Sequence, residues 1–311
     1  MKWLILVALV ACQSKSDDKP KDPWDTTPAG DADAPPTLGE RTRMVNEECP
    51  AVTNPFFFEV KKDGRTAHIL GTRHISVGLD KFPQVVRDEV DAASLAVFEV
   101  PPDDKVKPVF KPEPLREELG DQWAHYETLV GKSTAKRMEK QAPVVGMLAM
   151  IAMYEDISVF LDKQIEARVA EKKIPTGGFE TSKFQIDVLG KLLDAKMFKA
   201  MVAETPDRAK LKQLSHDAIV KYCTGVEHED DDMLDAVEPE KLAKYGYTKA
   251  DLERFKDVLL YRRNADWIPK LEKLFEQDKV FVAVGAGHLQ GPRGVIELLK
   301  KDGYEIRRIA K

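Results

Sequence analysis

The stretch "VFVAVGAGHLQGPRGVIELLKKDGYEIRRI" (residues 280–309) predicts a buried strand, a glycine-rich turn, an amphipathic helix and a closing strand. Its unusual residue is His288, which follows the apolar strand where a core would hold Val or Leu. The stretch "HILGTRHISVG" (68–78) repeats the pattern of an apolar strand, a Gly, two residues and a His, so that Gly71-Thr72-Arg73-His74 corresponds to Gly285-Ala286-Gly287-His288. In open α/β sheets the loops at the carboxyl ends of strands form the ligand crevice, so we expect both histidines at one rim of one sheet.

The chain alternates strands and helices at its two ends and is helical in its middle. A hairpin is predicted at 56–70, followed by a helix at 83–93 and a buried strand at 94–100. Apolar residues recur at intervals of three and four through the middle, and through a long amphipathic helix at 252–279 that leads into the strand at 280. We therefore predict an α/β fold: a central mixed or parallel sheet, built from two related strand-helix-strand units at the chain ends, with a helical insertion between them.

The first residues predict export and lipidation. The segment "MKWLILVALVACQS" has an early Lys and an apolar run too short to span a bilayer, which is typical of a signal peptide. Its Leu9-Val10-Ala11-Cys12 resembles a bacterial lipobox, so residues 1–12 are assigned to a lipoprotein signal with Cys12 as the lipidated residue. An ordinary secretory signal with a chance Cys is the alternative. Residues 13–48 are rich in Pro, Asp, Thr and Lys, a composition that favours a disordered tether.

Residues 49–311 are predicted to form one domain. The chain is 43% apolar and 32% charged, which suffices for a large core, and its net charge of -5 gives no general attraction to phosphate, so we expect no nucleic-acid partner. Cys49 and Cys223 remain in a compartment expected to be oxidising, where a disulfide and two buried thiols are both open. The acidic stretch 227–235 lacks the central Gly and final Glu of a calcium-binding loop, so we interpret it as a solvated helix start.

Four side chains have the chemistry of a metal or acid-base site. His74 and His288 offer imidazole nitrogens, and two imidazoles with one carboxylate leave positions open for water and substrate on a metal ion. Glu99 ends an apolar strand, where an unpaired charge is costly to bury. Glu180 follows a Gly-Gly pair and opens a predicted helix, so capping is its other interpretation. If one acid binds the metal, the other is a candidate general base.

Several motifs, in order along the chain, resemble the TraB/GumN family, which includes the Tiki proteins and is related to the erythromycin-esterase and ChaN group. The resemblance runs from about Phe56 to Ile309 and rests on "FFFEVKKDGRTAHILGTRH" (56–74), "LAVFEV" (95–100), "GGFETSKFQIDVL" (177–189), "YRRNADWIPKLEKL" (261–274) and "VFVAVGAGHLQGPRGVIELLKKDGYEI" (280–306). It implies a metal-dependent, peptidase-like hydrolase that uses Mn²⁺ or Co²⁺, or else Zn²⁺.

The resemblance also implies roles for individual residues. It makes His74 and His288 metal ligands together with Glu99 or Glu180, and it makes Gly71, Gly285 and Gly287 the motif glycines. Arg263 and Asn264 match an Arg-Asn pair of the family, in which Arg263 would clamp a carboxylate or stabilise developing negative charge and Asn264 would hold a loop or a ligand. Gln185 is a weaker candidate, and a helix residue that meets the backbone is its other interpretation.

One position departs from the family pattern. Arg73 stands where a small or apolar residue is expected, and there it would bind an anionic group of a substrate or disfavour a divalent ion. Two rival functions stay open: a non-catalytic ligand- or haem-binding envelope lipoprotein, as in the related ChaN group, and an inert envelope scaffold. The expected partners are a peptide or other envelope substrate and, through the lipid anchor, a membrane. The expected location is the cell envelope, at the outer membrane or periplasmic side, because Gln13 is not the Asp expected for inner-membrane retention.

Overall fold

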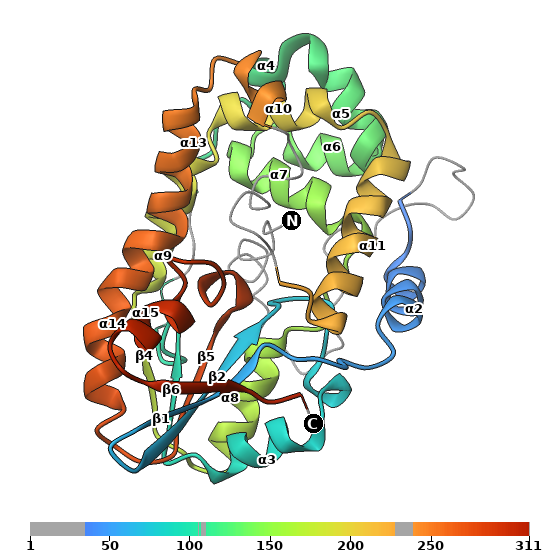
Figure 1. Cartoon of the computed structure of the whole chain (residues 1–311). Coiled ribbons are helices and arrows are strands. Elements are labelled where there is room, and N and C mark those ends of the chain that lie inside the picture. Colours follow the sequence, from blue (N-terminus) through green and yellow to red (C-terminus); the bar gives the residue numbers. More distant parts are fainter. Residues whose placement is uncertain (1–34, 105, 107–109, 228–238, 311) are drawn as a thin grey trace.

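A computed structural model of the protein describes residues 35–104, 106, 110–227 and 239–310. Within these residues six strands form one sheet in the order β4-β3-β5-β2-β1-β6 (Figure 1). The strands are β1 (Phe57–Lys62), β2 (Arg65–Thr72), β3 (Leu95–Phe98), β4 (Thr176–Gly178), β5 (Val280–Gly285) and β6 (Glu305–Arg308). The helices are α2 (Leu38–Glu48), α3 (Gln84–Ala92), α4 (Leu115–Leu119), α5 (Trp123–Val130), α6 (Lys132–Met138), α7 (Pro143–Ile151), α8 (Leu161–Glu171), α9 (Ser182–Leu192), α10 (Ala195–Glu204), α11 (Arg208–Thr224), α12 (Pro239–Ala243), α13 (Lys249–Lys256), α14 (Arg262–Leu274) and α15 (Val295–Lys301).

The sheet is mixed, and its central strands are the two that carry the repeated motifs. β2 and β5 are parallel neighbours, with Thr72 opposite Gly285, so the two motifs leave the sheet side by side at the same edge. β3 pairs in parallel with the other side of β5. Beyond β2, β1 pairs antiparallel with β2, and β6 pairs antiparallel with β1. The α/β prediction and the common rim for the two motifs are confirmed.

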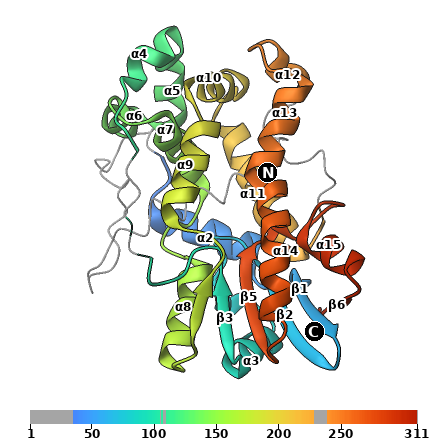
Figure 2. The same cartoon turned by 90° about the vertical axis from the view of Figure 1, so that its left-hand side faces the viewer.

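Helices cover the sheet and extend beyond its carboxyl edge. Figure 2 shows α8 and α14 on opposite sides of the strands, and the long α13-α14 unit rises from the sheet into the helical half of the molecule. Buried strand residues such as Ile69, Val97 and Val282 share one hydrophobic core with α3, α8, α14 and α15. A second core joins α5, α7, α10 and α13 above the carboxyl ends of the strands. The predicted helical insertion is this second half.

The predicted tether ends earlier than expected, because residues 38–48 form a helix rather than disordered chain. Thr37 and Glu40 form a capping box at the start of α2, and Val45 is buried against the core, which together give the segment a start signal and an apolar anchor. Residues 1–34, with the predicted signal peptide, Cys12 and most of the predicted tether, lie outside the described residues, as do 228–235 of the acidic stretch. No helix among the described residues is long and apolar enough to span a membrane.

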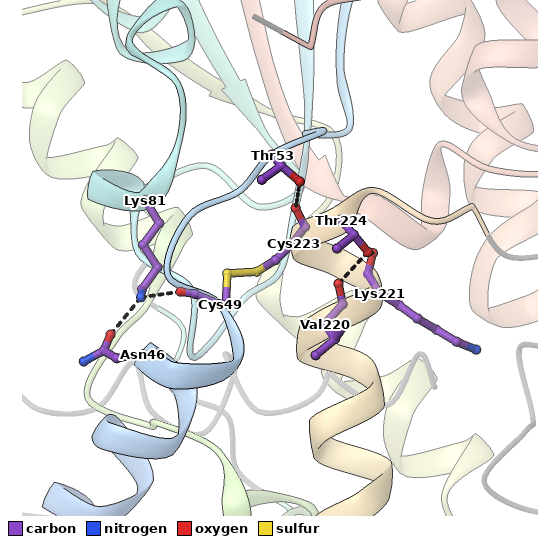
Figure 3. The surroundings of a disulfide bond; sticks show 8 residues. All are labelled: Asn46, Cys49, Thr53, Lys81, Val220, Lys221, Cys223 and Thr224. Atoms are coloured by element: carbon purple, nitrogen blue, oxygen red, sulfur yellow. Dashed lines mark hydrogen bonds between the residues drawn. A yellow bond between two sulfur atoms is a disulfide. The ribbon is translucent and has the colours of Figure 1, made fainter.

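A disulfide joins Cys49, directly after α2, to Cys223 in the last turn of α11 (Figure 3). The open choice between a disulfide and two thiols is thereby resolved. The surrounding backbone is also tied: Lys81 Nζ donates to the Cys49 carbonyl at 2.6 Å, and the Thr53 amide donates to the Cys223 carbonyl at 2.8 Å. The disulfide therefore ties the end of α2 to the end of α11, the helix that contacts the first histidine motif.

Candidate functional site

The two histidine motifs touch each other at Gly71. A Cβ atom at this position would lie 2.8 Å from Phe56 Cβ and 3.0 Å from both Ala286 Cα and Leu289 Cδ1, so only Gly leaves room for the backbone of the second motif. The Gly71 carbonyl accepts a hydrogen bond of 2.8 Å from the Tyr222 hydroxyl of α11. Close packing and this bond fix the turn from which His74 projects.

His74 is buried and is held by a carboxylate. Its Nδ1 lies 2.7 Å from Asp162 Oδ2, and Asp162 Oδ1 accepts a hydrogen bond of 3.0 Å from Thr72 Oγ1. Nε2 is buried and has no hydrogen-bond partner among the residues that the structure describes. Burial alone would lower the pKa of His74, but Asp162, through its charge and its hydrogen bond, and the charge of Glu99 raise that pKa above its usual value.

His288 is held in the same way, by an amide. Asn264 donates from Nδ2 to the Arg293 carbonyl at 2.9 Å, which turns its Oδ1 toward His288 Nδ1 at 2.6 Å. The other ring nitrogen, Nε2, then faces Glu99 Oε1 at 3.7 Å. The ring also packs on Trp267, with 4.3 Å between the ring centroids. The imidazole is therefore fixed in position and tautomer by its Nδ1 contact.

Glu99 follows β3 and is buried next to both motifs. Oε1 accepts 2.7 Å from the Gly285 amide, and Oε2 accepts 2.8 Å from Gln185 Nε2 and 2.9 Å from Arg263 Nη2. Burial alone would raise the pKa of this carboxyl. The positive charges of His288, Arg263 and His74, with the Gly285 N–H, instead lower the pKa to about 2.

Glu180 and Arg263 form the second layer of this network. Arg263 donates from Nε and Nη2 to the two oxygens of Glu180, each at 2.8 Å, and Trp267 Nε1 donates to Glu180 Oε1 at 3.0 Å. Gln185 Nε2 also reaches Glu180 Oε2 at 3.2 Å. The guanidinium is therefore a cation shared by Glu99 and Glu180 through charge-assisted hydrogen bonds.

A π-helical turn positions these donors. The predicted long helix exists as α13 and α14, but residues Asp257–Tyr261 between them form a π-helix. Arg263 Nη1 donates back to the Leu259 carbonyl of this turn at 2.8 Å. Such turns occur frequently at functional sites, and this one precedes Arg263, which contacts Glu99, and Asn264, which contacts His288.

The structure thus gathers most of the residues predicted from the sequence. His74, His288, Glu99, Glu180, Arg263, Asn264 and Gln185 lie in one buried network with the motif residue Gly285; Gly287 lies in the turn Ala286–His288. The donors of Arg263 point to Glu99, Glu180 and a carbonyl, so its contacts are those of a positioning residue. Cys12 lies outside the described residues.

Arg73 does not face this network. Its Nη2 donates to both oxygens of buried Glu155 at 2.9 Å, and Ser215 Oγ donates to the same carboxylate at 2.8 Å. The protein thus neutralises the cation that departs from the family pattern.

Three contributors were missed by the sequence reasoning. Trp267 lies one helical turn after Arg263, and that spacing was the signal that could have found it. Asp162 in the first turn of α8 and Thr72 inside the motif carry no comparable sequence signal, because their partner is set by the tertiary fold.

The charge of the network fits a cation. Glu99 and Glu180 share one guanidinium, that of Arg263, and the third acid, Asp162, contacts His74, so the acids of this network outnumber the arginine that they contact. Imidazole Nε2 atoms and a carboxylate are donors that suit Mn²⁺, Co²⁺ and Zn²⁺. Within the described residues, however, no three His, Cys, Asp or Glu side chains are already gathered at ligand spacing. The imidazole and carboxylate groups are therefore suitable ligands for a divalent ion, although three of them are not already gathered around one point in the described residues.

Comparison with known proteins relates the chain to a family. The sequence model of the TraB/PrgY/gumN family matches residues 56–308. No curated protein and no solved structure gives a significant match to the chain. The matched range includes both histidine motifs and every residue of the network described above.

Proposed function

Because the chain belongs to the TraB/PrgY/gumN family, we propose that it is a metal-dependent, peptidase-like hydrolase whose site is the buried network around the two histidine motifs. The observation that carries the proposal is the way the histidines are held. Both His74 and His288 are anchored through Nδ1 by a side-chain oxygen, so Nε2 is the ring nitrogen that would bind a ligand. Protein histidines that bind metal ions are held in this manner.

In this proposal His74, His288 and Glu99 hold a divalent ion, Mn²⁺ or Co²⁺, or else Zn²⁺. Such an ion, when bound, lowers the pKa of a water molecule and polarises a substrate carbonyl. Arg263 keeps Glu99 ionised and oriented, and Glu180 in turn holds the guanidinium of Arg263 in position. Glu99 is favoured over Glu180 as the ligand because its Oε1 lies 3.7 Å from His288 Nε2.

The proposed location is the cell envelope, with Cys12 as the lipid anchor and a peptide or another envelope compound as the substrate. The disulfide between Cys49 and Cys223 supports an oxidising compartment, because disulfides persist in exported proteins and are rare in the cytosol. The short apolar segment before Cys12 supports export.

The test is the metal content of the full-length protein, measured by elemental mass spectrometry without a His tag. We expect about one equivalent of Mn, Co or Zn in the wild type, and loss of the metal in His74→Ala and in His288→Ala. His216→Ala is the matched control, because its half-exposed ring lies beside Glu48 and outside the network. Retention in the control and loss in both variants would justify a screen of peptide substrates.

A wild-type protein that is free of metal, and that takes up none of these ions when they are added, would contradict the hydrolase proposal. The network would then favour the non-catalytic alternative, in which the same residues bind a ligand. Haem titration would test that alternative, since a Soret band lost in His74→Ala would support it.

A further inference from the structure

We propose that Asp162, held by Thr72, is a positioning residue that sets the orientation and the tautomer of His74. This inference rests on the proposed function for the role of His74 as a metal ligand, whereas the contacts of Asp162 that support it do not depend on that function. Asp162 Oδ2 lies 2.7 Å from His74 Nδ1, and Oδ1 accepts 3.0 Å from Thr72 Oγ1, so both carboxylate oxygens are used on the first histidine motif. A carboxylate only accepts hydrogen bonds, so the short contact places the ring proton on Nδ1.

The contact is part of a larger attachment between α8 and the first motif. The Leu161 amide donates to the His74 carbonyl at 3.3 Å, and Ile75 forms an isolated β-bridge with Phe160. An acidic side chain in the first turn of a helix ordinarily offsets the helix dipole at the surface. Asp162 differs, because its side chain is only 20% exposed and points to a buried imidazole. The start of α8 therefore holds the motif through both its backbone and this side chain.

The two histidines are consequently not equivalent. His74 is held by a carboxylate, whereas His288 is held by the neutral amide of Asn264. A carboxylate partner makes an imidazole more basic, so that its second nitrogen is a stronger ligand for a metal ion. His74 is therefore the stronger of the two donors toward a cation, and Asp162→Asn would make the two rings alike.

The first experiment reads the tautomer directly and needs neither metal nor substrate. Two-bond ¹H–¹⁵N spectra of the metal-free, full-length chain with ¹⁵N-labelled histidine are recorded in alkaline buffer, where the rings are neutral. The His74 signals are identified by their absence in His74→Ala. We expect a single tautomer at His74 with the proton on Nδ1 in the wild type, and a shift toward the Nε2–H tautomer in Asp162→Ala. Glu171→Gln, an exposed acid on the same helix, is the matched control and is expected to leave the tautomer unchanged.

The second experiment measures binding of Co²⁺ alone by calorimetry in the same set of proteins. We expect Asp162→Ala to bind Co²⁺ about 10- to 100-fold more weakly than the wild type, and Thr72→Val and Asp162→Asn to show smaller losses in the same direction. A residue that only stabilised the helix would lower the unfolding temperature without moving the tautomer.

The outcomes separate this inference from the proposed function. A wild-type spectrum with the His74 proton on Nε2 would overturn the inference, whether or not Asp162→Ala folds, and so would a tautomer that stays unchanged in a folded Asp162→Ala protein. A wild-type chain that shows the Nδ1–H tautomer, loses it in Asp162→Ala and binds no Co²⁺ would support the positioning role and contradict the metal-dependent function.

Discussion

Substituting Gly71 by Ala tests whether the two histidine motifs pack as closely as the structure shows. The added Cβ would lie 2.8 Å from Phe56 Cβ and 3.0 Å from Ala286 Cα, whereas carbon atoms normally approach to about 3.5–4.0 Å. Neither neighbour is the end of a flexible side chain, so the backbone of one motif must move. The third contact, with Leu289 Cδ1 at 3.0 Å, can relax by rotation of the side chain.

Overpacking of this kind costs about 1–3 kcal/mol, and the two rigid contacts place Gly71→Ala near the upper end of that range. In a domain of this size each kcal/mol lowers the melting temperature by about 2–4 °C, so we expect a fall of roughly 5–10 °C. Urea unfolding followed by circular dichroism, with the disulfide intact, gives the free energy of unfolding. The same separation of the motifs is expected to weaken Co²⁺ binding.

Gly177→Ala is the matched control. Gly177 is also a strand glycine of the sheet, but a Cβ there meets only Val97 Cγ2, at an ordinary 3.9 Å. Because the site has room, the substitution is expected to change the free energy of unfolding by less than about 1 kcal/mol. If Gly71→Ala proved as stable as Gly177→Ala, the close approach of the two motifs would be wrong.

Three further changes have definite expected results. Arg263→Met removes the cation shared by Glu99 and Glu180 and should lower the free energy of unfolding by about 3–5 kcal/mol. Combined with Glu180→Gln, it should lower the free energy of unfolding by less than the sum of the two single changes, and strict additivity in urea unfolding would count against the shared cation. Replacing Cys49 and Cys223 together by Ala should lower the free energy of unfolding by about 2–5 kcal/mol, and a reductant should weaken the wild type but not the double variant. The pKa of Glu99 in the folded state is about 2, below its ordinary 4.5, so the contribution of this carboxylate to stability is complete above pH 4.5 and is lost as the pH falls toward 2. At about 1.4 kcal/mol per pKa unit, the loss of free energy of unfolding is roughly 3 kcal/mol. Glu99→Gln should remove that part of the pH dependence measured by acid unfolding.

The sequence predicted the parts of the fold that repeat a pattern or run long. The two Gly-x-x-His motifs each follow an apolar strand, and that repetition correctly anticipated that both strands end at one rim of one sheet; the direct pairing of β2 with β5 came only from the structure. The three-residue strand β4 was missed, because "TGG" has little strand propensity and pairs only through its neighbour β3. The Pro- and Asp-rich composition before Thr37 hid the start of α2.

The residues of the site also fall into two groups, those that the sequence marked and those that only the fold brings together. Residues inside the motifs, such as His74 and Asn264, were visible in the sequence because the family resemblance marks them. Asp162 was not, since an acid in the first turn of a helix is ordinary and only the fold brings it to His74. The pairing of Cys49 with Cys223 was also undecided, because two cysteines in a chain say nothing of the distance between them.

The disulfide also determines how the domain would carry mechanical load. Tension applied between residues 35 and 310 passes from α2 through the Cys49–Cys223 bond into the end of α11, so the segment closed by the bond, a sequence separation of 174, bears none of it. At about 3.4 Å per extended residue, roughly 600 Å of chain is thereby withheld from stretching. Three of the network's acids and the first histidine lie inside that protected loop, whereas Arg263, Asn264 and His288 lie outside it. A force strong enough to unfold the sheet would therefore unfold the second motif first, because the first motif lies in the segment that the disulfide closes.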